Sequence, residues 1–175
     1  MRNNKIKIFL TLLFAFITIN LIFAIDNSST SNEKAPNIIL YDINGKPFNL
    51  RTLKDKNYTL INFSATYCKP CKEEIPEFIK LQKEFSDKIL KIYLIFIDPD
   101  IDKIKSFVKE NKISLNILHD KYNIVKNKYG VINIPVTFLL NSNDIIIYKA
   151  IGYRKSNIDE IRKIIKKEEN KWKNY

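Results

Sequence analysis

The stretch Asn62-Phe63-Ser64-Ala65-Thr66-Tyr67-Cys68-Lys69-Pro70-Cys71 contains both cysteines of this 175-residue chain, three positions apart. It follows directly on an apolar run, Tyr58 to Ser64, whose β-branched and aromatic residues are typical of a strand buried on both faces. After the cysteines, apolar residues recur at helical spacing and predict an amphipathic helix over residues 69–86; they are Ile75, Phe78, Ile79 and Phe85. Cys68 therefore stands where a buried strand gives way to a helix.

This position favours ionisation of Cys68. Unpaired N–H groups and the helix dipole attract an anion to a helix N-terminus. Pro70 costs no helical hydrogen bond in the first turn, and Lys69 adds a neighbouring positive charge. Lowering a thiol pKa from about 8.5 to about 7 requires about 2 kcal/mol, and a helix terminus supplies between about 0.3 and 2 kcal/mol. We therefore assign Cys68 as the attacking thiolate and Cys71 as the thiol that resolves the mixed disulfide.

Other uses of a Cys-x-x-Cys pair fit the chain less well. A zinc site needs two further ligands, and beyond the sulfurs only His119 and scattered carboxylates are present. A haem attachment site needs a histidine after Cys71, where this chain has Lys72. A purely structural disulfide would close a very small loop and stabilise little. The sequence thus predicts no metal and no cofactor besides the redox-active disulfide Cys68–Cys71.

The rest of the domain predicts an α/β fold with a mixed central sheet and helices on both faces. A hairpin is expected from Asn37 to Leu50 around Gly45, and a last helix from a capping box formed by Ser156 and Asp159. Between them we expect strands at residues 92–97, 136–140 and 145–151 and helices around residues 101–108 and 122–129.

The charge is strongly basic, with 30 Lys and Arg against 19 Asp and Glu and a net charge of +11. These residues are spread along the chain, and no basic stretch is interleaved with stacking aromatic residues, so we expect no nucleic-acid partner. With 45% hydrophobic residues, wholesale disorder is excluded.

The N-terminus has the pattern of an export signal. Arg2, Lys5 and Lys7 precede a mostly apolar, uncharged run from Ile8 to Ala24. We predict a signal peptide or signal anchor at residues 1–24, a flexible polar linker at 25–34 and the folded domain at 35–175. The protein would then be exported, either periplasmic or anchored to the outer face of the cytoplasmic membrane, with membrane contact only through this segment.

From Ala35 to about Arg162 the chain resembles the thioredoxin superfamily, and most of all its exported TlpA/ResA branch. The likeness is carried by the hairpin residues 42–47, the stretch ending in Cys-Lys-Pro-Cys, Pro76 inside the first helix, and Ile134-Pro135-Val136-Thr137-Phe138. It implies a thioredoxin-like fold with an added N-terminal β-hairpin. It also implies that Pro135 follows a cis peptide bond and faces the sulfurs, and that Lys69 and Pro70 support the active site together with it. A substrate peptide would then bind along the backbone at Ile134 and beside Tyr67.

One departure from the family concerns proton transfer. Cytosolic thioredoxins carry a buried Asp where this chain has Asn62, and Asn cannot accept a proton. A proton at Cys71 must therefore pass to water or to a carboxylate such as Glu73 or Glu74, although both carboxylates also fit an ordinary solvated helix face.

The resemblance implies a monomeric thiol–disulfide oxidoreductase. Its partners would be cysteine-containing extracytoplasmic proteins, apocytochromes among them, and a membrane-bound or exported thiol donor. A thiol peroxidase of the peroxiredoxin-related group is an alternative, but the residues before Cys68 lack the proline of its Pro-x-x-x-Thr-x-x-Cys pattern. A Sco-like copper(I) carrier would use His119 with both thiolates, yet such carriers have three residues between their cysteines. Otherwise His119 is a polar surface residue at a strand end.

Overall fold

The computed structural model describes residues 33–53 and 57–172, with side chains as far as residue 167. The expected signal segment and all but the last two residues of the expected linker lie outside this range. Those two residues meet strand β7, since Lys34 forms a β-bridge with Ile145 and the Glu33 carbonyl accepts the Ile146 N–H. Among the described residues, no helix combines the length and the apolar character needed to cross a bilayer.

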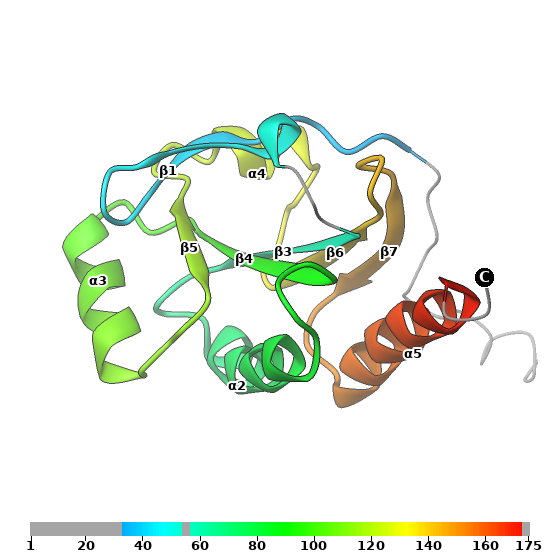
Figure 1. The fold of residues 1–175 in the computed structure, drawn as a ribbon. Coiled ribbons are helices and arrows are strands. Elements are labelled where there is room, and N and C mark those ends of the chain that lie inside the picture. Colours follow the sequence, from blue (N-terminus) through cyan, green and yellow to red (C-terminus); the bar gives the residue numbers. More distant parts are fainter. Residues whose placement is uncertain (1–32, 54–56, 173–175) are drawn as a thin grey trace, which may run out of the picture.

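The described chain forms one seven-stranded mixed sheet with the strand order β2-β1-β5-β4-β3-β6-β7 (Figure 1). In chain order the elements are β1 (Ile39–Asp42), β2 (Pro47–Asn49), the short helix η1 (Leu50–Thr52), β3 (Tyr58–Ser64), α2 (Lys69–Glu84), β4 (Leu90–Phe96), α3 (Ile101–Glu110), β5 (Asn116–His119), α4 (Ile124–Lys128), β6 (Val136–Leu140), β7 (Ile146–Ile151) and α5 (Lys155–Trp172). Strands β3, β4 and β5 are parallel, while β1, β6 and β7 run antiparallel to their neighbours β5, β3 and β6.

The hairpin β1–β2 extends the sheet at one edge. Its turn is stabilised by the Asp42 carboxylate, which accepts the N–H groups of Asn44 and Lys46 at 2.8 Å each. Gly45 has φ +83°, a left-handed conformation that glycine adopts without steric cost. The added N-terminal hairpin expected from the resemblance is thereby confirmed.

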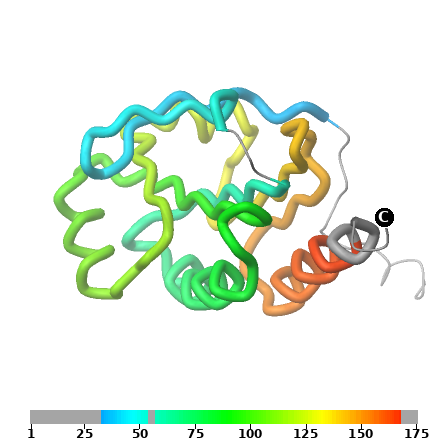
Figure 2. Tube along the Cα trace, in the orientation of Figure 1, coloured from blue at the N-terminus to red at the C-terminus, as the bar shows by residue number. Residues whose placement is uncertain are grey.

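Helices cover both faces of the sheet, as expected. Figures 1 and 2 show α2 and α5 on one side and α4, with the N-terminal hairpin, on the other. Each face buries its own apolar cluster. One joins α2, α3 and α5 to the sheet through residues such as Phe78, Phe107 and Ile161, and the other joins α4 and the hairpin through Val125 and Ile38.

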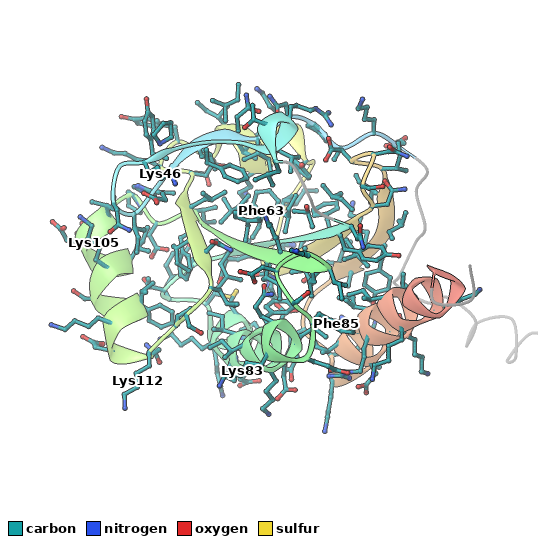
Figure 3. All side chains as sticks on the ribbon, viewed as in Figure 1. Lys46, Phe63, Lys83, Phe85, Lys105 and Lys112 are labelled. Atoms are coloured by element: carbon teal, nitrogen blue, oxygen red, sulfur yellow. A yellow bond between two sulfur atoms is a disulfide. The ribbon has the colours of Figure 1, made fainter. Side chains whose placement is uncertain are left out.

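The two clusters lie on opposite sides of β3 and β4, the central strands. Phe63 belongs to the cluster on the side of the hairpin and Phe85 to the cluster on the side of α2 and α5, while Lys83, Lys105 and Lys112 lie at the periphery (Figure 3). All seven residues of β3 are buried, in agreement with the pattern expected for a strand covered on both faces. The segment that carries the two cysteines therefore leaves the sheet from a fully buried strand.

Two details differ from the sequence-based expectation. Strand β5 had no predicted bounds, although His119 was expected at a strand end, and it supplies the link between β4 and the hairpin. The last helix begins at Lys155, so Ser156 lies inside its first turn and the predicted capping box is wrong. Asn157 instead donates its side-chain amide to the Gly152 carbonyl at 3.1 Å, which ties this first turn to the end of β7.

Candidate active site

The two cysteines lie at the beginning of α2 and form a disulfide. Cys68 is the N-cap residue, with extended backbone angles, and its Sγ accepts the backbone N–H of Cys71 at 3.3 Å. Pro70 occupies the first turn, where its missing N–H costs no helical hydrogen bond. The Cys68 sulfur thus takes the place that a Ser or Asp oxygen occupies in an ordinary N-cap.

The two sulfurs differ in access. Cys68 is 7% exposed and Cys71 only 1% exposed, while Lys69 and Pro70 between them are exposed. A partner approaching from solvent therefore meets Cys68 first. Lys69 and Pro70 form the outer surface of this short turn.

The loop before β6 packs against the two cysteines. The Ile134–Pro135 peptide bond is cis, as expected from the resemblance. Ile134 and Ile97 pack against the small buried cluster of Ala65, Cys68 and Cys71. The β3–β6 ladder begins at Val136, so Ile134 lies outside it.

A buried carboxyl group lies in the same helix as the cysteines. Glu74 is 1% exposed and accepts a hydrogen bond from the Asn62 amide at 2.9 Å and another from the Thr137 hydroxyl at 3.2 Å. Burial raises the pKa of Glu74 from 4.5 to about 7, because desolvation of the charged form outweighs these two hydrogen bonds. Glu74 also lies one helical turn after Cys71, on the same face of α2.

Comparison with known proteins agrees with this arrangement. The AhpC/TSA family matches residues 31–149 of the chain. The chain belongs to the AhpC/TSA family. Thiol-disulfide oxidoreductase ResA of Bacillus thuringiensis subsp. konkukian is 31% identical over 134 residues, which cover 76% of this chain and 77% of the relative. ResA of Bacillus subtilis is 30% identical over 133 residues, covering 76% and 74%.

The fold of this AhpC/TSA protein is also found among solved structures. The thioredoxin domain of a thiol-disulfide oxidoreductase from Bacteroides vulgatus superposes with a TM-score of 0.69 and is 26% identical, covering 78% of this chain and 98% of that domain. The thioredoxin-like fold and the enzyme class predicted from the sequence are thus confirmed: the protein is a thiol–disulfide oxidoreductase.

In the sequence, Glu73 and Glu74 were equivalent candidates for proton transfer at Cys71. The structure of this AhpC/TSA protein distinguishes them. Glu73 is exposed on α2, whereas Glu74 is buried one helical turn after Cys71. The solvated-face interpretation is therefore wrong for Glu74. Its partner Thr137 was not recognised as part of the site, although a polar residue inside the apolar run of β6 is a signal that could have found it.

The remaining residues expected at the site fall into two places. Tyr67 is 70% exposed immediately before Cys68. His119, at the end of β5, is half-buried, and its Nε2 lies 2.8 Å from the Asp98 carbonyl oxygen. Within the described ranges 33–53 and 57–167, no three side chains of the metal-ligating types gather into a cluster.

Proposed function

We propose that the protein is an exported thiol–disulfide oxidoreductase in which Cys68 attacks the disulfides of extracytoplasmic proteins and Cys71 resolves the product. The observation that carries this proposal is the Cys68 sulfur at the N-cap of α2, with the Cys71 N–H directed at it. A thiolate formed there gains the hydrogen bond and the favourable end of the helix dipole. Cys68 is also the more exposed of the two sulfurs.

The chemistry requires the reduced pair and two steps of exchange. The Cys68 thiolate attacks one sulfur of a substrate disulfide, so that a mixed disulfide forms and the other substrate sulfur leaves as a thiolate. Cys71 then loses its proton and attacks Cys68, which releases the second substrate thiolate and forms the Cys68–Cys71 disulfide. The substrate gains two electrons, the protein loses two, and an exported or membrane-bound thiol donor restores the dithiol.

Glu74 is the group we propose for the proton of Cys71. It lies one turn further along α2, is shielded from solvent, and has a pKa near neutrality, where a carboxyl group can both take and return a proton. Glu73 is exposed and has no comparable contact with the interior, so we assign it no part in the transfer.

Export and the identity of the substrates belong to the same proposal. The basic and then apolar N-terminal segment supports export, and the similarity to ResA proteins supports an extracytoplasmic thiol–disulfide exchange. Ile134 and Tyr67 flank the sulfurs and would contact a substrate peptide. Apocytochromes during cytochrome c maturation are the substrates we infer from the TlpA/ResA resemblance.

A trapping experiment tests the resolving role and the substrates together. The Cys71→Ser variant lacks the second thiol, so its mixed disulfide with a substrate should persist instead of being released. Expressed as the full chain in cells, it should carry covalent, dithiothreitol-sensitive adducts of exported proteins, detected by non-reducing electrophoresis and mass spectrometry. The double variant Cys68→Ser/Cys71→Ser should carry none. The proposal is contradicted if the adducts contain cytoplasmic proteins only, or if Cys68→Ser alone traps the same partners.

A further inference from the structure

Asp98 is a buried acid that the exchange chemistry does not use. It follows β4 by two residues and is only 2% exposed. None of the ion pairs formed among the described residues involves it. Burying a carboxylate without a cation is unfavourable unless hydrogen bonds compensate for its lost hydration. The groups that donate these hydrogen bonds to Asp98 therefore indicate its role.

The compensating groups come from one residue of the active-site loop. The Thr66 backbone N–H lies 3.0 Å from Oδ2 and 3.2 Å from Oδ1 of Asp98, and the Thr66 hydroxyl also donates to the carboxylate. Thr66 lies within the turn that leads from β3 to α2, where the Cys68 N–H donates to the Ala65 carbonyl at 3.2 Å. Asp98 therefore holds the chain two residues before the Cys68 sulfur.

Asp98 is itself fixed from the other side. Its backbone carbonyl accepts a hydrogen bond from His119 Nε2 at 2.8 Å, and His119 pairs with Phe96 in the β4–β5 ladder. Ile97, between Phe96 and Asp98, packs against the cysteine cluster. The ends of three parallel strands are thus tied to one another around the start of α2. We call Thr66, Asp98 and His119 the loop clamp.

We propose that Asp98 is a positioning residue which, through Thr66, holds Cys68 next to Cys71 and so shifts the Cys68–Cys71 couple toward the disulfide. In the dithiol, a loop that is already fixed keeps the two sulfurs at a high effective concentration. If the loop were not held, the two sulfurs would lie apart for part of the time. Formation of the disulfide would then cost more conformational entropy. The clamp therefore makes the protein a stronger reductant. This inference rests on the proposed redox role of the pair.

The test is the equilibrium of the purified protein with mixtures of reduced and oxidised glutathione. The dithiol fraction is measured by alkylation and mass spectrometry. Thr66→Val removes the hydroxyl donor without a change in shape or charge, and should shift the equilibrium constant about threefold toward the dithiol. Asp98→Asn should shift it about tenfold, which corresponds to about 30 mV. Thr66→Ser keeps the hydroxyl donor and should give the same equilibrium constant as the wild type.

Asp120 provides a matched control. It is 1% exposed, and its carboxylate accepts a hydrogen bond from the backbone N–H of Lys126 in α4 at 2.7 Å. Asp120 therefore holds α4 and not the active-site loop. Asp120→Asn should lower stability in urea yet leave the glutathione equilibrium unchanged. The clamp is refuted if Asp120→Asn shifts the equilibrium as far as Asp98→Asn does, or if Thr66→Val behaves like Thr66→Ser. A wild-type pair that fails to exchange with glutathione at all would instead refute the proposed function, and the clamp with it.

Discussion

Replacing Cys68 by serine will reduce the dithiothreitol-dependent reduction of insulin to the rate of dithiothreitol alone. The hydroxyl of serine is a far weaker nucleophile than a thiolate at neutral pH, and Cys71 is too buried, at 1% exposed, to take over the attack. The turbidity of precipitating insulin chains gives the rate directly. We expect the wild type to accelerate the reaction at least tenfold.

Two controls make this loss interpretable. Lys69→Ala lies beside Cys68 at an exposed position and should keep most of the activity, because Lys69 adds only a modest charge effect. Peroxide consumption in the absence of a dithiol distinguishes the peroxidase alternative, and we expect none above background. Equal insulin reduction by the wild type and Cys68→Ser would show that the pair does not catalyse the exchange.

The oxidised wild type will lose stability relative to its Glu74→Gln variant as the pH rises from about 4.5 to about 7. Folding raises the pKa of Glu74 from 4.5 to about 7, so the folded state holds this proton more tightly than the unfolded state does. The contribution is therefore fully present below the unfolded pKa and is lost as the pH passes the folded pKa. Raising the pKa of Glu74 from 4.5 to about 7 corresponds to about 3 kcal/mol of unfolding free energy.

Urea unfolding of both proteins at pH 5 and pH 8 measures this change. The glutamine amide resembles the protonated acid and does not titrate. The Thr137 hydroxyl, 3.2 Å from a Glu74 carboxylate oxygen, can accept a hydrogen bond from this amide. Glu73→Gln, one residue away and exposed, is the matched control and should follow the wild type at both pH values. Parallel stability curves for the wild type and Glu74→Gln would contradict the buried, proton-binding state.

The sequence predicted the longer apolar strands better than the short strand β5. Strands β3 and β6 were predicted with the bounds that the structure has, because apolar and β-branched residues predominate in each. For strand β5, Asn116–His119, only its end at His119 was expected, and its bounds could not be predicted because only Ile117 and Leu118 in it are apolar. Such a short strand is specified by its partners β4 and β1, and not by a pattern of its own.

The site residues also differ in how far the sequence could predict them. The cysteines and Pro135 were found because their motifs are local in sequence. Glu74 could have been separated from Glu73, since it precedes Phe78 by four residues and Leu81 by seven and so shares the buried face of α2. Asp98 gives no such signal, because its partner Thr66 is 32 residues earlier and only the sheet brings them together.

Attack by Cys68 on a substrate disulfide depends most directly on the acidity of its thiol. The Cys71→Ser variant, made either as residues 33–175 or as the full chain, contains only the Cys68 thiol. In its reduced form, absorbance at 240 nm reports formation of the Cys68 thiolate as the pH is raised. With the sulfur at the N-cap of α2, we expect a midpoint near neutrality, more than a unit below the value of about 8.5 for an ordinary cysteine. A midpoint at or above that ordinary value would contradict the claim that the start of this helix prepares Cys68 for attack.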